Sequence, residues 1–208
     1  MIGRDEERVL TGKPKIAVLA MQGDFEKHMQ ALERAGADPI AARLPDDIRK
    51  ADGIILPGGE STTIGKLLVR YGVDDAIRDA AAAGRPIYGT CAGLILLSRG
   101  IAAETAERGG QLQFGLLDAT VVRNAFGRQV DSFESDLDIP AIGDEPLRAV
   151  FIRAPAIQDM GSEVEVLAEH EGKPVFVRQG RILGSAFHPE LTGDDRVHRL
   201  FLSMVEES

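Results

Sequence analysis

The sequence predicts an α/β protein in which helices cover both faces of a mostly parallel sheet, giving three layers. In the first half, short apolar runs alternate with amphipathic segments at the spacing of parallel strands joined by crossover helices. Glycine-rich turns follow some of these runs, as at Pro57-Gly58-Gly59. In the second half, short apolar runs are joined by tight turns such as Glu171-Gly172-Lys173, so we expect extra antiparallel strands there.

The elements of the first half are bounded by local signals. We expect strands at residues 15–20, 39–42, 53–56 and 86–88, and helices at 25–35, 61–68 and 74–83. Gly36 and Gly84 stand where glycine commonly ends a helix. Ser61 belongs to a residue type that caps a helix N-terminus.

The second half is expected to contain strands and one final helix. The strands are predicted at residues 116–122, 149–153, 164–170, 174–178 and 181–186, and the amphipathic helix at 196–206. Residues 124–144 have weak periodicity and are interpreted as an ordered functional loop or excursion. Residues 1–14 are predicted to be a flexible N-terminal extension and 15–208 a single domain.

Composition narrows the class of protein. The net charge of −9 over 208 residues, without a basic stripe, argues against nucleic-acid binding. No apolar run approaches the roughly 20 residues of a membrane span, and the charged first residues do not form a signal peptide. One cysteine cannot form an internal disulfide, which fits a reducing cytoplasm. The sequence has no Cys/His cluster at ligand spacing, so we expect no structural zinc site. We also predict no other metal and no cofactor.

The single cysteine lies in an unusual local pattern. Residues 89–93 read Gly-Thr-Cys-Ala-Gly between a predicted strand and an apolar stretch, which is the form of a nucleophile elbow with Cys91 in place of serine. A lone cysteine is more often a small buried apolar residue. The flanking glycines favour a nucleophile, because the turn brings backbones close together. A sulfur above a helix N-terminus also favours the thiolate.

A candidate base and carboxylate occur near the other end, at His188-Pro189-Glu190. Two residues apart in an extended segment, His188 and Glu190 would point to the same side. A carboxylate beside an imidazole holds its tautomer and stabilises the imidazolium. The alternative is a histidine with a purely structural role. Combined with the elbow, the pattern indicates a cysteine-nucleophile enzyme.

Two further features have both a structural and a functional interpretation. The turn at Gly58-Gly59 is common between strand and helix, but a glycine amide there could face an oxyanion, with Ala92 as the second donor. Arg123 and Arg153 each lie at or after a predicted strand end. Most such arginines are solvated, although a substrate carboxylate would suit an arginine fork.

The motifs resemble a known family. The elbow and His188-Pro-Glu190 are similar to the Cys-His-Glu triad of class I glutamine amidotransferases, which have a flavodoxin-like sheet. The longer motifs are similar to the glutaminase subunits of pyridoxal 5′-phosphate synthase, over about residues 15–206. They are Ala20–Gly23, Leu56–Thr63, Arg123–Glu134, Phe151–Pro155 and Ser185–Glu190.

The resemblance implies a role for each matching residue. Cys91 would be the nucleophile, His188 the general base and acid, and Glu190 its orienting partner. The implied glutamine-binding residues are Gly58, Gly59, Glu60, Arg123, Ile152 and Arg153, and the implied oxyanion donors are the amides of Gly59 and Ala92. The ammonia would pass to a separate β/α-barrel synthase subunit that builds the cofactor from a pentose phosphate and a triose phosphate.

Three alternatives remain open at this stage. The chain could be a glutaminase subunit for another pathway, such as histidine or guanylate synthesis, although the motifs at 58–61 and 123–129 favour the cofactor pathway. It could be a partner-independent hydrolase or chaperone-like protein of the wider cysteine-elbow superfamily, which glutamine turnover would distinguish. It could also be a binding subunit without chemistry, against which the intact Cys91, His188 and Glu190 argue.

Overall fold

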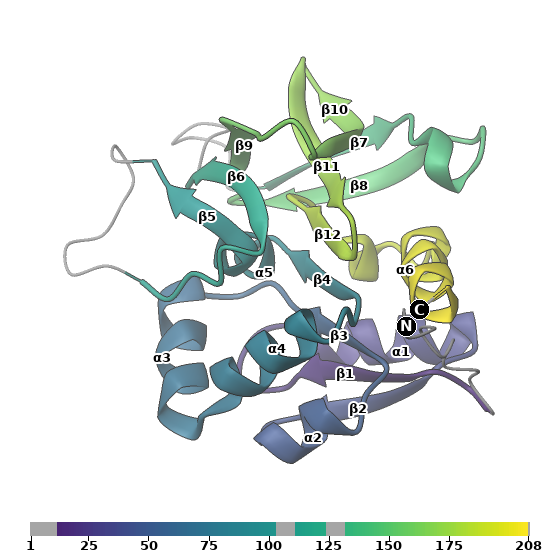
Figure 1. Ribbon diagram of the computed structural model, residues 1–208. Coiled ribbons are helices and arrows are strands. Elements are labelled where there is room, and N and C mark those ends of the chain that lie inside the picture. The colour runs from purple at the N-terminus through teal and green to yellow at the C-terminus, as the bar shows by residue number, and fades with distance from the viewer. Residues whose placement is uncertain (1–11, 103–110, 124–131, 208) are drawn as a thin grey trace, which may run out of the picture.

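The structure is a computed structural model that describes residues 12–102, 111–123 and 132–207 (Figure 1). Within these residues the central sheet has seven strands in the order β10-β11-β12-β4-β3-β1-β2. They are β1 (Lys15–Leu19), β2 (Asp38–Ala42), β3 (Gly53–Leu56), β4 (Ile87–Thr90), β10 (Glu165–His170), β11 (Lys173–Gln179) and β12 (Ile182–Ser185). Strands β2, β1, β3, β4 and β12 run parallel, and β11 and β10 continue the sheet antiparallel. The predicted mostly parallel sheet is confirmed.

The helices form two groups, one on each face of the sheet (Figure 1). They are α1 (Phe25–Ala35), α2 (Pro45–Arg49), α3 (Ser61–Tyr71), α4 (Val73–Ala82), α5 (Ala92–Leu97) and α6 (Arg196–Glu206). Helices α1 and α6 pack on each other, whereas α2, α3, α4 and α5 pack as the second group. The three-layer α/β architecture follows from this arrangement.

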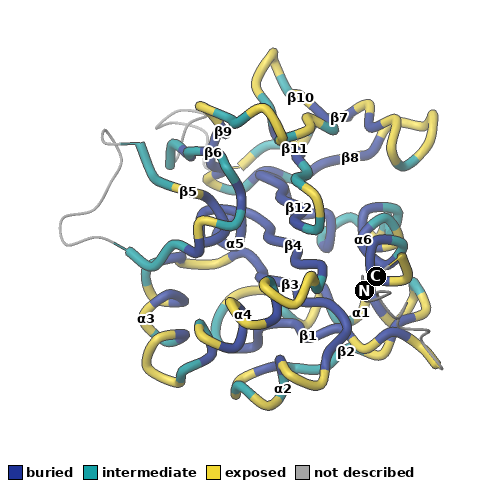
Figure 2. Tube along the Cα trace, in the orientation of Figure 1, coloured by how far each residue is buried: buried dark blue, intermediate teal, exposed yellow. Residues whose placement is uncertain are grey.

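The core lies between the sheet and the helices on each side. Every residue of β3 and β4 is buried, because parallel strands under two helix layers have no solvent face (Figure 2). This explains why the strands read as continuous apolar runs rather than as alternating ones. Helix α1 presents a single apolar side and ends at Gly36, whose φ of 101° is the left-handed conformation expected of a C-terminal glycine.

Two smaller sheets pack beside the central one. One joins β5 (Ser98–Ile101), β6 (Leu117–Val122) and β9 (Ala156–Gln158), and the other pairs β7 (Ser132–Leu137) with β8 (Leu147–Ile152) antiparallel. The expectation of extra antiparallel strands is therefore confirmed.

The interpretation of residues 124–144 as a loop is wrong for β7. This strand is mostly exposed or half-buried along the two-stranded ribbon that it forms with β8, and it has little apolar content besides Phe133 and Leu137, so its sequence signal is weak. Residues 124–131 lie outside the described part of the chain. The short elements α2, β5 and β9 were also not predicted.

The start of α3 differs from the sequence prediction as well. The N-terminal cap is Glu60 rather than Ser61: its carboxylate accepts hydrogen bonds from the amides of Thr62 and Thr63 at 2.9 and 2.7 Å. Ser61 is the first helical residue, and the helix continues to Tyr71 before Gly72 ends it. Among the described helices, none has the length and apolar character needed to cross a membrane.

The sheet topology brings separate turns to one edge. Strands β12, β4, β3 and β1 are parallel neighbours, so their carboxyl ends lie side by side (Figure 1). The residues that follow these ends are His188, Cys91, Gly58 and Gly23 with their neighbours. Ligand sites of open α/β sheets form at this edge.

Candidate active site

Cys91 occupies the sharp turn between β4 and α5. Its backbone has φ 48° and ψ −99°, a conformation that residues with a side chain rarely adopt. A Cβ on Gly89 would lie 2.6 Å from the carbonyl carbon of Gly93, and a Cβ on Gly93 would lie 2.0 Å from the Leu56 oxygen. Both glycines are therefore required by close backbone approach, as the sequence analysis proposed for the elbow.

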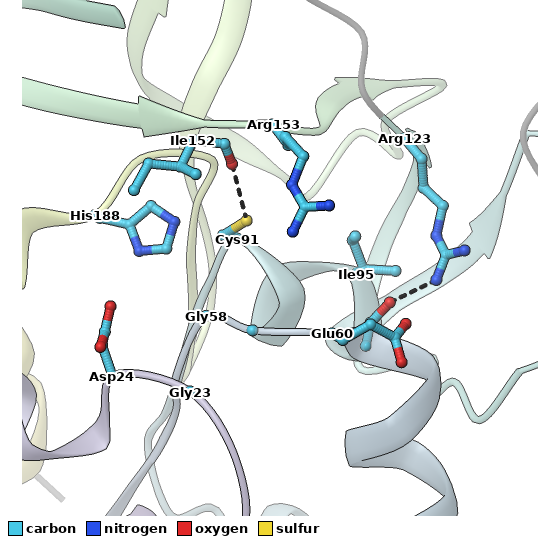
Figure 3. Close-up of a pocket in the computed structure, with 12 residues that line it drawn as sticks. Gly23, Asp24, Gly58, Glu60, Cys91, Ile95, Arg123, Ile152, Arg153 and His188 are labelled. Atoms are coloured by element: carbon cyan, nitrogen blue, oxygen red, sulfur yellow. Dashed lines mark hydrogen bonds between the residues drawn. The ribbon is translucent and has the colours of Figure 1, made fainter. Parts of the chain in front are cut away.

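The sulfur of Cys91 reaches a cavity of about 410 Å³. The backbone of Cys91 is anchored to the neighbouring strand β12, because its amide donates a hydrogen bond to the Ser185 oxygen at 2.8 Å. The sulfur lies 3.8 Å from the carbonyl oxygen of Ile152 (Figure 3). This volume suits a small-molecule substrate.

His188 and Glu190 form a buried pair next to this cysteine. The Nδ1 atom of His188 lies 2.7 Å from Oε1 of Glu190. The other ring nitrogen, Nε2, faces the sulfur of Cys91 (Figure 3). Contrary to the prediction from the sequence, the pair does not form through an extended segment. His188 precedes a 3-10 turn at Pro189–Leu191, and this turn curls the carboxylate back onto the imidazole.

The pair is electrostatically matched. Burial disfavours a charged imidazole, but interactions with Cys91 and Glu190 outweigh it and raise the pKa of His188 to about 10. Burial also opposes the charge on Glu190, yet neighbouring His28 and the contact with His188 lower the pKa of this carboxyl to about 2. The site therefore favours an imidazolium next to the sulfur and an ionised carboxylate behind it.

The turn after β3 lies against the imidazole and the cavity. A Cβ on Gly58 would lie 2.3 Å from Cε1 of His188, so the imidazole needs glycine at this position. Gly59 has φ 146° and lies next to Gln22, whose Oε1 accepts a hydrogen bond from the Glu60 amide at 2.8 Å. The turn after β1 thus fixes the turn after β3.

Charged side chains line the cavity opposite His188 (Figure 3). Hydrogen bonds from Thr62 and Thr63 overcome the effect of burial and lower the pKa of Glu60 to about 2. Arg153 follows β8 with φ 44°. Arg123 follows β6 and donates to the Ser61 hydroxyl at 2.6 Å, to Thr62 at 3.2 Å and to Gln111. The cavity lining therefore includes two guanidinium groups, of Arg123 and Arg153, and two carboxylates, of Glu60 and Asp24.

Comparison with known proteins agrees with this geometry. Residues 18–207 match the model of the SNO glutamine amidotransferase family. The chain belongs to this family. The SNO glutamine amidotransferase chain is 53% identical over 188 residues to a protein of Pelotomaculum thermopropionicum named pyridoxal 5′-phosphate synthase subunit PdxT, covering 90% of this chain and 93% of that one. It is 52% identical over 195 residues to the protein of the same name from Frankia casuarinae, covering 94% and 96%.

Solved structures show the same fold. A crystal structure titled glutamine amidotransferase superposes with a TM-score of 0.85 at 46% identity, covering 91% of this chain and 98% of that one. PurLQS from Thermotoga maritima superposes with a TM-score of 0.64 at 21% identity, covering 92% and 98%, which supports the fold alone. The class I glutamine amidotransferase fold predicted for this amidotransferase is confirmed.

The structure gathers most of the predicted site residues around the cavity. Those that line it are Gly58, Gly59, Glu60, Cys91, Arg123, Ile152, Arg153 and His188. Glu190 lies buried behind His188, and Ala92 is the buried first residue of α5. The amide of Ala92 has no acceptor within the helix, because the first amides of a helix never do.

Other lining residues of this amidotransferase were not predicted as site residues. They are Gly23, Asp24, Ser61 and Ile95. Gly23 and Asp24 follow β1, which neighbours β3, so their place at the carboxyl edge of a parallel sheet was the available signal. Ile95 comes one turn after Cys91 in α5, where its amide bonds to the Cys91 oxygen at 3.1 Å.

Proposed function

We propose that this chain is the glutaminase subunit of pyridoxal 5′-phosphate synthase, releasing ammonia from L-glutamine for a β/α-barrel synthase subunit. One observation carries the chemistry: a strained elbow cysteine beside a buried His188–Glu190 pair, at a cavity lined by charged groups. The pathway is proposed because relatives 53% and 52% identical over nearly the whole chain are named as subunits of this synthase. We place the protein in the cytoplasm, where the single thiol stays reduced.

The reaction is acyl transfer through a thioester. A proton passes from the Cys91 thiol to Nε2 of His188, and the thiolate attacks the side-chain amide carbon of glutamine. The carbonyl oxygen becomes an oxyanion, for which the amides of Gly59 and Ala92 are the donors. As the C–N bond breaks, His188 returns the proton to nitrogen and ammonia leaves. Water then attacks the thioester with His188 as base, the C–S bond breaks, and glutamate departs.

Glu190 keeps its charge throughout this cycle. Its carboxylate holds the Nδ1–H tautomer of His188 and stabilises the imidazolium that exists between the two proton transfers. The raised pKa of His188 and the lowered pKa of Glu190 agree with this role, since both favour the charged forms of the two groups.

The charges around the cavity match the amino-acid end of glutamine. Arg123 and Arg153 suit its α-carboxylate, and Glu60 suits its α-ammonium group. The backbone of Gly58 and Ile152 forms the wall along the aliphatic part. No cofactor is needed for this hydrolysis, since each proton transfer has a protein group.

The alternatives explain fewer observations. A binding subunit without chemistry would not need the strain at Cys91 or the closely packed Gly58 beside His188. A partner-independent hydrolase would not need groups complementary to a free amino acid. A glutaminase for another pathway shares the chemistry, and the named relatives favour the cofactor pathway.

The decisive experiment separates ammonia production from its use. The chain is combined with a barrel synthase subunit, a pentose phosphate and a triose phosphate, and cofactor formation is followed with glutamine or with ammonium chloride. Cys91→Ala should abolish formation from glutamine and leave formation from ammonium intact. Glutamine-dependent formation by the variant, or its absence with the unreplaced chain, would contradict the proposal.

A further inference from the structure

Two buried histidines extend from Glu190 into the interior. His28 of α1 and His198 of α6 are both fully buried, with His28 Nδ1 3.0 Å from His198 Nε2. On its other side, His28 Nε2 lies 3.2 Å from the Thr90 hydroxyl and 3.4 Å from Oε2 of Glu190. A continuous line of titratable side chains therefore runs from Cys91 through His188, Glu190 and His28 to His198.

Neither histidine is used by the chemistry described above. Buried polar side chains are costly unless they are paired, so two such histidines call for an explanation. The Oε1 atom of Glu190 is occupied by His188, whereas the buried Oε2 atom forms no hydrogen bond within the described residues. His28 Nε2 lies 3.4 Å from this oxygen, as a close polar neighbour rather than a hydrogen-bond partner, while its hydrogen-bond contact is the Thr90 hydroxyl at 3.2 Å.

The contacts select one proton arrangement. An unprotonated Nε2 of His28 could accept a hydrogen bond from the Thr90 hydroxyl at 3.2 Å, but its lone pair would also lie 3.4 Å from the carboxylate oxygen, which is repulsive. A proton on Nε2 makes His28 Nδ1 the acceptor, so that His198 donates from Nε2. His198 Nδ1 is then unprotonated. This agrees with its surroundings, since it is buried without a partner in the described part of the chain and an N–H there would lack an acceptor.

We propose that His28 and His198 are positioning residues for the glutaminase reaction: neutral His28 carries its proton on Nε2, beside Oε2 of Glu190 and the Thr90 hydroxyl, and His198 fixes that tautomer. The inference rests on the proposed role of Glu190 in the triad. His188 then supports Oε1 of Glu190 and His28 supports Oε2. Because both oxygens have a neighbouring N–H group, Glu190 keeps its charge and its alignment with His188. The arrangement thereby sets both the rate of proton transfer and the pH at which Glu190 loses its charge.

The neutral state of both histidines fits their surroundings. Burial lowers the pKa of His28, opposed by Glu190 and Asp24 and reinforced by His188. Burial likewise lowers the pKa of His198 to about 3; His28 and Arg34 act in the same sense and Glu190 in the opposite one. The ring of Tyr88 packs edge-on against both imidazoles from β4, and its hydroxyl bonds to Ser185 at 2.8 Å.

Three variants of α1 test this role in the chain with its barrel partner present. His28→Leu removes the donor at similar size, and His28→Gln keeps a donor near the Nε2 position. Leu32→Val, one turn further along the same helix, loosens packing at a buried apolar residue without removing a polar group. We expect His28→Leu to lower kcat about 10- to 100-fold with little change in KM, because it leaves a buried carboxylate oxygen unsupported. The acid limb of the pH–rate profile should move to higher pH, since Glu190 then protonates more readily. His28→Gln should restore both quantities to within about threefold.

A merely structural role predicts a different result. If His28→Leu lowers the melting temperature but leaves kcat and the acid limb where Leu32→Val leaves them, the proposal is wrong. If the His28→Leu chain does not fold, nitrogen NMR of the unreplaced protein decides between the two roles instead. A proton on Nε2 of His28 and of His198 supports the proposal, and a proton on Nδ1 of His28 overturns it. Absence of glutamine hydrolysis in the unreplaced complex would instead reject the proposed function, leaving the proton positions measurable.

Discussion

Gly58 lies directly against the imidazole of His188. A Cβ at this position would come within 2.3 Å of Cε1 and 3.0 Å of Nδ1, the nitrogen that contacts Glu190. The turn after β3 is thus part of the wall that fixes the ring, in addition to lining the cavity. Because His188 must serve both Glu190 and Cys91, a small displacement of its ring disturbs two contacts.

Gly58→Ala should therefore act on catalysis more than on stability. The methyl group would push the imidazole away from Cys91, and misplacing a catalytic group by about 1 Å costs on the order of 100-fold in rate. Glutamine hydrolysis at saturating substrate measures the effect. Gly100→Ala is the matched control, because its Cβ would meet only Thr120 at 3.6 Å. A Gly58→Ala chain as fast as this control would show that the ring has room to move.

The strain at Cys91 predicts an unusual order of stability. With φ 48° and ψ −99°, any residue with a Cβ is strained, and glycine is not. Both Cys91→Ala and Cys91→Gly should lose glutamine hydrolysis, but Cys91→Gly should unfold at higher urea, by about 1 kcal/mol or more in the free energy of unfolding. Equal stabilities, or a more stable alanine variant, would mean that the elbow relaxes when the sulfur is absent.

Arg153 should govern substrate affinity. A contact with the glutamine carboxylate is much the same in the ground state and the transition state, so Arg153→Ala should raise KM more than it lowers kcat. Steady-state kinetics with glutamine measure both. Arg148→Ala is the control, because Arg148 lies on β8, the strand that Arg153 follows, but pairs with Asp136 on the surface. A fall in kcat at unchanged KM would assign Arg153 to the chemistry instead.

The sequence predicted what local patterns determine. The bounds of α1, β3 and α6 were predicted to the residue, because helix periodicity, Gly36 and the turn after Leu56 leave few alternatives. The Cys91 elbow was equally local. The contact between His28 and His198 joins residues 170 positions apart and depends on how α1 packs against α6. No spacing in the sequence signals such a pair.

The buried His198 predicts a specific acid sensitivity. Burial lowers its pKa to about 3 in the folded chain, whereas an imidazole in the unfolded chain titrates near the ordinary value of about 6.5. The contribution of neutral His198 to the free energy of unfolding is fully present above about pH 6.5 and is lost as the pH falls towards 3. Over that window the unfolded chain binds one more proton, so the free energy of unfolding falls by about 1.4 kcal/mol per pH unit from this group.

His198→Gln isolates this contribution. Urea unfolding at several pH values between about 7 and 5 gives the slope for each chain, and the variant should have the shallower slope. The other titrating groups, His188 and Glu190 among them, are present in both chains. Parallel slopes would show that His198 is not held neutral in the folded protein.

Partner binding should strongly raise the glutaminase rate. Gly59, the proposed oxyanion donor, has φ 146° and lies in a turn fixed to Gln22 by the Glu60 amide. A peptide beside two glycines can rotate at little steric cost, so docking of the barrel subunit can align the Gly59 amide. One oxyanion donor is worth on the order of 100-fold or more in rate, and activation should be of that size. Ammonia release by the purified chain is measured before and after the partner is added. A chain that is fully active alone would place the Gly59 amide in its catalytic orientation already, and the partner would then serve only to receive the ammonia.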